Sequence, residues 1–373
     1  MQSLSRWTEG TGAAIASFDY SAAFDTIDRK TVQERLEDIG ASQVVKTWMA
    51  SYLDDGRQRV RWNAALSSIL SRKHGVAQGS KAGPIIFILV TMVNFALLQR
   101  ALAYADDTHT SSGSVKELAK DSQVLVELSS ELGLSLNPTK TKLLFFGKVL
   151  DKEEDFKVGD VTIPPSQDLT LLGFTFDEKL RPEPYLQELY NSVLYRKHTV
   201  GRLSAHLPPH VLKIFAGAVV LGKIRTYLHL ALKVRLQDQD PRTGWGKKLQ
   251  VVLNDVARVL VKKRRTDHVR VEDLLKKSGL QSINAMVCSS SAMLAWRAAD
   301  PGHPLHGLLA TLKPRTSTRS KEAGLLQVPP PDTNNLALWN IATVWNAMPD
   351  LRAAKSEGAA KRVVKKFVRS IPI

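Results

Sequence analysis

Apolar and polar positions follow two different periods in the first part of the chain, which predicts a mixture of strands and helices. Residues 13–18 are small, apolar and partly β-branched, and they end at Asp19, which indicates a buried strand followed by a carboxylate. Residues 31–53 and 115–132 instead carry apolar side chains at helical spacing. The stretch 101–108 predicts another strand that reaches a tight turn at two aspartates.

Shorter segments lie between these elements. Residues 57–62 alternate like a strand and follow a turn signal. Pro84 is well placed to open an apolar helix over 85–98, because proline fits the first turn of a helix. Residues 134–146 return to a strand pattern that is interrupted by the polar stretch NPTKT.

The pattern becomes helical in the second part of the chain. Residues 158–163 and 169–176 are predicted to form a hairpin pair, and a helical pattern extends over 184–291. Residues 313–335 are rich in Pro, Ser, Thr and charge, which is typical of a linker. An amphipathic helix over 352–369 follows. This order predicts an α+β fold, with a catalytic module followed by a helical one.

Composition and charge narrow the classes of function. The apolar content of 43% fits an ordinary globular protein, and the longest apolar stretch, 84–98, is too short to span a membrane. The single cysteine, Cys288, excludes an intramolecular disulfide and a cysteine cluster for zinc, so a reducing compartment is expected. No secretory signal is apparent at the N-terminus.

The net charge of +16 is unevenly distributed. Residues 1–148 carry 17 Lys and Arg against 15 Asp and Glu, whereas the remainder carries 35 against 21. A nearly neutral first part followed by a basic second part suits a metal-dependent site joined to a surface that binds a polyanion. Charge alone leaves open a basic protein whose lysines are simply solvated.

Three carboxylates, Asp19, Asp106 and Asp107, stand at the ends of apolar strands. An unpaired charge would be costly to bury there, but a divalent cation between two strand ends would compensate it. Mg²⁺ prefers carboxylate oxygens and keeps positions for water or phosphate. Two such ions stabilise the attacking and leaving oxygens of an in-line phosphoryl displacement, which is the chemistry of nucleotidyl transfer.

Five ordered motifs now make a family resemblance specific. FDYSAAFDTID (18–28) resembles motif A of non-LTR reverse transcriptases, GVAQGSKAGPIIF (75–87) motif B, and YADDT (104–108) motif C. GLSLNPTKTKLLFF (133–146) resembles motif D, and LTLLGFTFD (169–177) resembles the primer grip, motif E. The distal segments 249–269 and 345–354 are similar to LINE-type elements of the Jockey and chicken-repeat groups.

The resemblance implies a right-hand polymerase palm, with an antiparallel sheet and helices, followed by a helical thumb and a helical C-terminal region. The expected domains are the palm at 1–148, the primer-grip region at 149–183, the thumb at 184–265, a helical region at 266–312, the linker at 313–335 and a basic tail at 336–373. The fingers that precede motif A in the family are expected to be missing, as in an N-terminally truncated copy.

Catalytic roles are carried over position by position. The resemblance implies that Asp19 and Asp106 are the main metal ligands, with Asp107 beside them, for two Mg²⁺ ions or Mn²⁺ in their place. Phe24 matches the bulky gate that disfavours a 2′-OH, although a core phenylalanine would look the same. Lys140 matches a proton donor to the leaving pyrophosphate, although a lysine beside a turn is often only solvated.

Further positions are expected to contact substrates. Tyr20, Gln78 and Gly79 are predicted to lie against the incoming nucleotide, since glycine permits a close approach of the backbone. The backbone of Leu171, Leu172 and Gly173 is predicted to hold the primer. Two motif A carboxylates, Asp25 and Asp28, are expected to serve structure or a helix cap.

The basic run Lys262, Lys263, Arg264 and Arg265 is a candidate for phosphate contact, although a solvated helix end is an alternative.

The sequence therefore predicts an RNA-directed DNA polymerase that uses an RNA template, a DNA primer and deoxynucleoside triphosphates, with nuclear action implied by the resemblance and no membrane partner. Two alternatives remain open. One is a catalytically inactive, truncated remnant that binds nucleic acid through its basic C-terminal half. The other is an RNA-dependent RNA polymerase of viral type, against which the YADD and QG motifs and Phe24 all argue.

Overall fold

The chain divides into two compact units, Met1–Gly173 and Phe174–Ile373. A computed structural model describes residues 12–371 except 55, 72–73, 78, 99, 238–243, 308–311, 313–324 and 330–335, and it leaves out the side chains of 93–97. The boundary between the units falls inside the predicted primer-grip region, 149–183.

The first unit is built on a four-stranded antiparallel sheet. Its strands are β1 (Ala13–Phe18), β7 (Ala101–Tyr104), β8 (Asp107–Ser112) and β10 (Lys142–Phe146), in the order β10-β1-β8-β7. The strand β1 is almost wholly buried, because it lies between β10 and β8 and its small alanines allow a helix to pack closely on it. In its register, Ile15 lies opposite Leu144 and Phe18 lies opposite Thr108.

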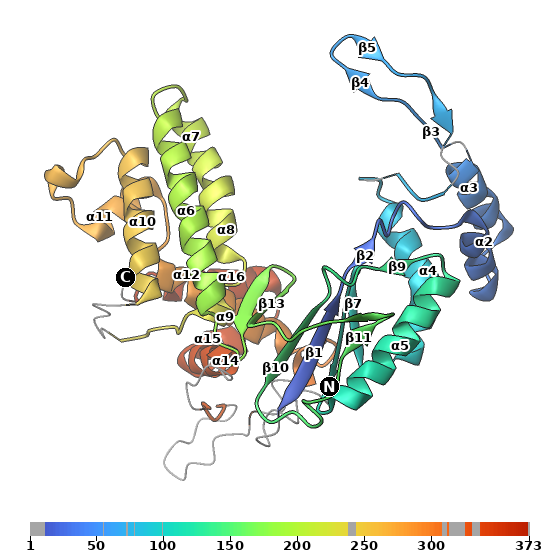
Figure 1. Cartoon of the computed structure of the whole chain (residues 1–373). Coiled ribbons are helices and arrows are strands. Elements are labelled where there is room, and N and C mark those ends of the chain that lie inside the picture. Colours follow the sequence, from blue (N-terminus) through green and yellow to red (C-terminus); the bar gives the residue numbers. More distant parts are fainter. Residues whose placement is uncertain are drawn as a thin grey trace. The chain divides into compact units, whose positions relative to one another are not determined.

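One helix covers this sheet (Figure 1). Helix α5 (Val115–Glu131) confirms the predicted amphipathic helix, with Leu118 and Leu125 completely buried in a core that includes Phe18. The polar Ser122 and Ser129 share this buried side, whereas Val124 is 38% exposed. The residues that α5 buries are therefore those on one side of the helix, whether or not their side chains are apolar.

A second core in this unit forms around three helices. The predicted helical range 31–53 is divided at Gly40 (φ +66°) into α2 (Arg29–Asp38) and α3 (Gln43–Asp54), and the apolar helix after motif B is α4 (Gly83–Leu97). Asp28 confirms its expected role as a cap, because its Oδ2 accepts a hydrogen bond of 3.2 Å from the backbone N–H of Thr31.

Motif B is docked on motif A through backbone hydrogen bonds. The N–H of Gly75 donates to the carbonyl of Ile27 at 2.7 Å, and the N–H of Val76 donates to that of Phe24 at 2.8 Å. Gly75 has φ +77°, and a Cβ at this position would lie only 2.6 Å from the Cα and O of Asp25. Only glycine therefore allows the two segments to approach this closely.

An arm of short strands extends from the first unit (Figure 1). Strands β3 (Arg57–Gln58) and β6 (Leu70–Ser71) pair with each other, as do β4 (Arg61–Trp62) and β5 (Ala65–Leu66). Every residue from 57 to 71 is exposed. The strand pattern predicted for 57–62 is confirmed, but here it marks an exposed ribbon.

The remaining strands of the first unit are short, and one predicted pairing is wrong. Strand β2 (Tyr20–Ser21) pairs with β9 (Ser135–Leu136). Strand β11 (Lys157–Val158) pairs with β12 (Val161–Thr162). The range 158–163, which was predicted to pair with 169–176, therefore forms a hairpin by itself. The other predicted range, 169–176, contains a two-residue turn that divides it into β13 (Asp168–Leu171) and β14 (Phe174–Asp177), and these two strands pair with each other. Close turn residues inside each range favour local hairpins over the more distant pairing.

The second unit is helical after its first strand. Its helices are α6 (Glu183–Leu203), α7 (Pro209–Ala216), η1 (Gly217–Leu221), α8 (Gly222–Arg225), α9 (Leu228–Ala231), α10 (Trp245–Leu260), η2 (Arg265–Asp267), α11 (Val271–Ser278), α12 (Ile283–Ala298), α14 (Leu336–Ala347), α15 (Pro349–Arg352) and α16 (Glu357–Phe367). Among the described residues, no helix combines the length and apolar character needed to cross a membrane.

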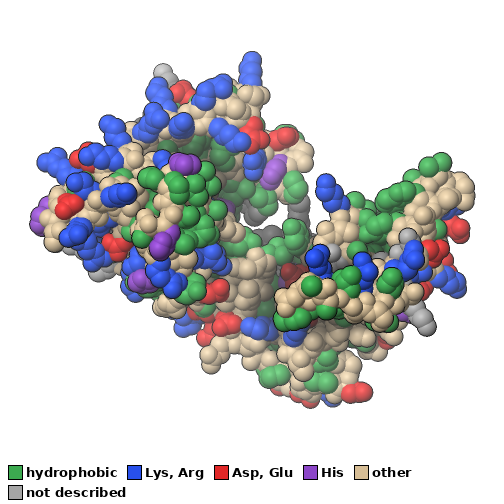
Figure 2. All heavy atoms as spheres, turned by 90° about the horizontal axis from the view of Figure 1, so that it is seen from above, with side chains coloured by type: hydrophobic (Ala, Val, Ile, Leu, Met, Phe, Trp, Pro, Cys, Tyr) green, Lys and Arg blue, Asp and Glu red, His purple; other side chains and the backbone are tan. Residues whose placement is uncertain are grey.

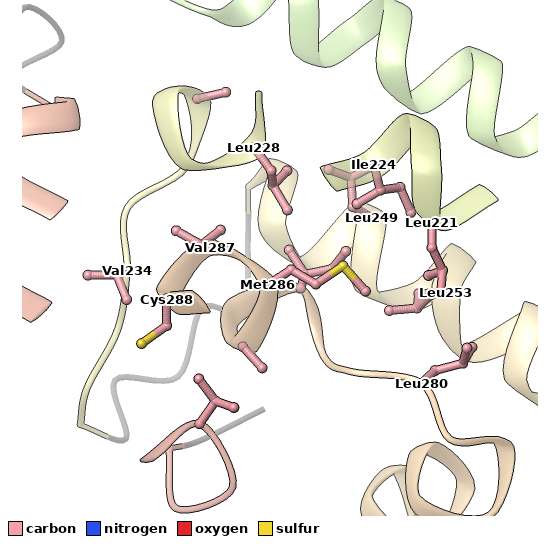
Figure 3. Packing of buried hydrophobic residues seen from close by; sticks show 14 of the residues in the cluster. Leu221, Ile224, Leu228, Val234, Leu249, Leu253, Leu280, Met286, Val287 and Cys288 are labelled. Carbon is pink, nitrogen blue, oxygen red and sulfur yellow. The ribbon is translucent and has the colours of Figure 1, made fainter. Parts of the chain in front are cut away.

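Helix α12 lies at the centre of this unit, where it packs against α9, α10, α14 and α16. Figure 3 shows its Met286, Val287 and Cys288 among side chains from neighbouring helices. Burial raises the pKa of the Cys288 thiol to about 12, so the thiol stays protonated and serves as a small apolar side chain.

Two buried amides hold irregular backbone in this core. Asn340 on α14 accepts a hydrogen bond from the N–H of Val234 and donates to the carbonyls of His229 and Leu232, all at 2.8 Å. Asn284 on α12 bonds both the N–H and the carbonyl of Arg235. These amides satisfy backbone groups that no regular element pairs.

The described part of the predicted linker, 325–329, also makes specific contacts. Leu325 is buried, and Asn346 on α14 bonds both the N–H and the carbonyl of Leu326 at 2.8 Å.

Gly75→Ala is expected to destabilise the first unit by roughly 2–5 kcal/mol, because it adds both a clash with motif A and the strain of a positive φ. Gly40→Ala is the matched control, since Gly40 has a positive φ but open space around it, and should cost only about 1–2 kcal/mol. Urea denaturation measures both values. Equal losses would show that the docking of motif B tolerates a side chain.

Candidate active site

Backbone register brings the three predicted catalytic carboxylates to one end of the sheet. Phe18 at the end of β1 lies opposite Thr108 on β8, so this register, continued by one residue beyond its last pair, sets Asp19 opposite Asp107. Tyr104 pairs with Asp107 across a two-residue turn that contains Asp106. Side chains of directly opposite residues lie on the same face of a sheet, so Asp19 and Asp107 share a face.

The turn that carries Asp106 has an unusual backbone. Ala105 adopts φ +53°, a conformation that costs an L-residue about 1–2 kcal/mol. Tight two-residue hairpins need such values because the turn must match the twist of the strands. The surrounding sheet therefore holds a strained residue beside the predicted ligands, as is common at functional sites.

A loop from motif D is fixed against Asp19. The N–H of Asn137 donates to the backbone carbonyl of Asp19 at 2.7 Å, and the carbonyl of Asn137 accepts from the N–H of Lys140. Lys140 Nζ then lies 3.1 Å from Asp19 Oδ2. The structure thus brings the motif A carboxylate and the motif D lysine together.

The carboxylates fit a divalent cation by their donor chemistry. The Oδ2 atom of Asp19 is buried and receives no hydrogen bond, in spite of the nearby ammonium group. Carboxylate oxygens are the donors that Mg²⁺ prefers. Among the described residues, however, no three His, Cys, Asp or Glu side chains gather closely enough to hold a metal ion. The residues share one end of the sheet without forming a closed cage.

The predicted nucleotide contacts differ in accessibility. The Tyr20 side chain is buried against Phe87, and its hydroxyl lies 3.3 Å from Ser129 Oγ. Burial raises the pKa of Tyr20. Because this side chain belongs to the core, a nucleotide contact from Tyr20 would have to use its backbone. Phe24 is only half-buried and packs on Phe87 with ring centroids 5.2 Å apart, so core packing and a gate role are compatible.

Gly79 has φ +79° and nothing within 4 Å of the position of a Cβ, which leaves room for a ligand. Its neighbour Gln78 lies outside the described residues. The nucleotide contacts of both remain predictions.

The predicted primer grip lies at the turn between β13 and β14. Leu172 and Gly173 both have positive φ, +50° and +82°, as in a type I′ turn. Leucine is poorly suited to this conformation, and its side chain is 45% exposed. The backbone geometry of Leu171, Leu172 and Gly173 is thus well defined, while their contact with a primer stays a prediction.

The residues of the basic run 262–265 in the second unit differ in whether they contact a carboxylate. Arg265 forms two hydrogen bonds, of 3.1 and 2.6 Å, with the carboxylate of Asp255 on α10, and Lys263 lies 3.8 Å from Asp267. Lys262 and Arg264 are exposed beside a cavity of about 350 Å³. Lys262 and Arg264 therefore face solvent, whereas Lys263 and Arg265 each lie beside a carboxylate of the second unit.

Sequence analysis missed the backbone contacts that assemble the site. The only local signal for the docking of motif B was the glycine at position 75. The contact between Asn137 and Asp19 has no signal in the sequence, because it uses main-chain atoms only.

Comparison with known families assigns the class of the first unit. Residues 4–176 match the family "Reverse transcriptase (RNA-dependent DNA polymerase)". This part of the chain is therefore similar to reverse transcriptase domains, and its α+β palm with helical regions agrees with that fold. No curated protein matches the chain.

Among solved structures, the chain is similar to telomerases. The telomerase of Candida tropicalis in complex with the TWJ fragment of telomeric RNA is 15% identical, with 78% of this chain and 50% of that chain covered and a TM-score of 0.37. Apo telomerase from Candida tropicalis is 14% identical, with 74% and 52% covered and a TM-score of 0.38. The telomerase of Candida albicans is 13% identical, with 78% and 50% covered and a TM-score of 0.36. The chain spans about half the length of these proteins.

The ion pairs of Asp255 should make the stability of the second unit depend on pH. Burial by itself raises the pKa of Asp255, but hydrogen bonds from Arg265 and the charges of Lys197 and Arg258 lower it overall. Because the folded-state pKa is depressed, the stabilisation is present above the ordinary value of 3.8 and is lost as the pH falls through the lower folded-state value. Asp255→Asn should therefore reduce the loss of unfolding free energy that the parent protein shows as the pH falls, measured by urea denaturation at several acid pH values. If the unfolding free energy of the variant fell with pH as steeply as that of the parent, this assignment would be contradicted.

Proposed function

We propose that this chain is the palm and downstream part of a reverse transcriptase of the non-LTR retrotransposon type. It would add deoxynucleotides to the 3′-OH of a DNA primer along an RNA template, acting in the nucleus on chromosomal DNA. The observation that supports this most directly is the register between β1 and β8, which ends at Phe18 and Thr108 and is followed directly by Asp19 on one strand and preceded by Asp107 and the Asp106 turn on the other. The five ordered motifs and the family match over residues 4–176 support the same function.

The proposed reaction is a nucleotidyl transfer. The primer 3′-OH releases its proton to water and its oxygen forms a bond to the α-phosphorus of the nucleotide, the bond from that phosphorus to the bridging oxygen breaks, and pyrophosphate leaves. Asp19, Asp106 and Asp107 would hold two Mg²⁺ ions, or Mn²⁺, which when bound neutralise the charge on the phosphates and polarise the reacting oxygens. Positioning and electrostatics supply most of such catalysis.

The surrounding residues have separate tasks in this proposal. Phe24 lies beneath the sugar and disfavours a 2′-OH. Gln78 and Gly79 line the nucleotide, and the turn at Leu172 and Gly173 positions the primer through its backbone. Lys140, beside Asp19, protonates the leaving pyrophosphate, because a donor at this point avoids release of a highly charged anion.

Asp106→Asn is expected to abolish incorporation of deoxynucleotides on a primed RNA template with Mg²⁺, because an amide cannot replace a carboxylate ligand. Asp160→Asn is the matched control: Asp160 is exposed in the β11–β12 turn and lies outside the five motifs, so its variant should keep the parent's rate. Circular dichroism checks that both variants fold. Extension by Asp106→Asn at the parent's rate would overturn the metal assignment.

A lack of incorporation by the folded parent protein would favour the second candidate function. The basic part after residue 148 and the exposed Lys262, Lys263 and Arg264 favour binding of nucleic acid without catalysis. That function predicts steeply salt-dependent binding, whatever metal is present.

Lys140→Gln is expected to slow incorporation by about 10²-fold or more, as for loss of a general acid. Its effect on folding should stay within about 1 kcal/mol, because the pair with Asp19 is exposed on the lysine side. Lys142→Gln is the control, since Lys142 forms a comparable exposed pair with Asp168 at 3.4 Å. Equal rates for the two variants in single-turnover assays would reject the proton-donor role.

A further inference from the structure

A basic cavity of about 590 Å³ lies within the second unit, and none of the predicted catalytic carboxylates lines it. It opens between the α8–α9 segment, α12 and α16, and four cationic side chains line it: Arg225, Arg297, Lys361 and Lys365. No Asp or Glu is among the described residues that line it. Its size is typical of sites that bind small molecules or parts of larger ones.

The fold positions these cations from distant parts of the sequence. Lys361 and Lys365 are four residues apart on α16, which places them on one face about 6 Å apart along the axis. Helix α16 packs on α12, which carries Arg297, and Trp296 Nε1 donates to the carbonyl of Ala354 ahead of α16. The arrangement of the cavity is therefore part of the packed core.

Neighbouring polar groups orient the cations without neutralising them all. Glu357 lies 3.0 Å from Arg297 and 2.7 Å from Lys361, and these contacts lower its pKa. Arg225 donates to Gln281 Oε1 at 3.1 Å. One carboxylate thus faces two of the four cations, and an excess of positive charge and of N–H donors is left for a ligand.

The rest of the lining suits a ligand that is both anionic and partly apolar. Met286, Met293 and Val364 contribute apolar surface, and Met286 is also part of the core in Figure 3. His229 lines the cavity with a buried Nδ1 that has no hydrogen-bond partner. Burial lowers the pKa of His229, so near pH 7 the ring is neutral, and the described residues supply no hydrogen-bond partner for its Nδ1.

We propose that this cavity binds a phosphodiester segment of a nucleic-acid strand. Phosphates match the unneutralised cations, and the sugar and base faces match the apolar surface beside them. The cavity lies in the basic part of the chain, and Figure 2 shows many Lys and Arg side chains on the viewed face. The inference does not depend on polymerase activity, because binding can be measured with the Asp106→Asn protein.

The decisive comparison uses two double variants of one helix. Lys361→Gln with Lys365→Gln removes two charges from the cavity, and Arg362→Gln with Lys366→Gln removes two exposed charges of α16 that do not line it. Fluorescence anisotropy with a labelled single-stranded RNA of about 16 nucleotides reports affinity. The cavity variant should bind about tenfold more weakly or worse, with the slope of log affinity against log salt reduced by roughly 1.4, and the control should change far less.

Equal losses in the two double variants would overturn the proposal, because they would reflect net charge alone. Arg225→Gln gives an independent test from a different element, should the lysine variant fail to fold. Weaker RNA binding by Arg225→Gln supports the cavity, and unchanged binding rejects it.

Competition distinguishes a strand from a free phosphate compound. Unlabelled RNA should displace the probe at concentrations near its own affinity, whereas inorganic phosphate and deoxyadenosine triphosphate should need a large excess. Displacement by the triphosphate as readily as by RNA would show a mononucleotide site, and the assignment to a strand would be wrong.

Discussion

Backbone hydrogen bonds between β1 and β8 fix the register that brings Asp19 and Asp107 to one end of the sheet, and the rest of the predicted catalytic end is arranged around these two residues. A shift of one residue would turn Asp19 to the opposite face of the sheet. The buried alanines of β1 and the helix packed on the sheet make such a shift costly. Motif B and the loop around Asn137 then attach to motif A through main-chain atoms. Because main-chain hydrogen bonds hold these segments together, the side chains of the predicted site are not needed for that purpose.

Much of the first unit could be predicted because local patterns determine it. The strand before Asp19, the turn at Asp106 and the helix over 115–132 all follow from periodicity and turn residues. The motifs added the predicted catalytic positions, since Asp19 and Lys140 are more than a hundred residues apart and no local rule joins them. The structure places these two side chains 3.1 Å apart.

Pairing and side-chain direction were harder to predict. The pattern over 158–176 shows extended segments but does not show which partner each one takes, and local turns decided that outcome. Tyr20 follows Asp19 directly, so strand alternation turns its side chain away from the carboxylate and into the core. The cations of the second-unit cavity come from positions as far apart as Arg225 and Lys365. Only the packing of helices brings them together.

The amide of Asn340 has a consequence for the order in which the second unit can be completed. Its three hydrogen bonds serve backbone groups of residues 229–234, more than a hundred positions earlier in the chain. During synthesis these backbone groups have no partner before α14 has left the ribosome, so until then they must be hydrogen-bonded to water. Because a dry core cannot close over unpaired backbone groups, consolidation of the whole helical unit is coupled to the arrival of its C-terminal helices. The unit therefore behaves as a single cooperative structure with a late final step.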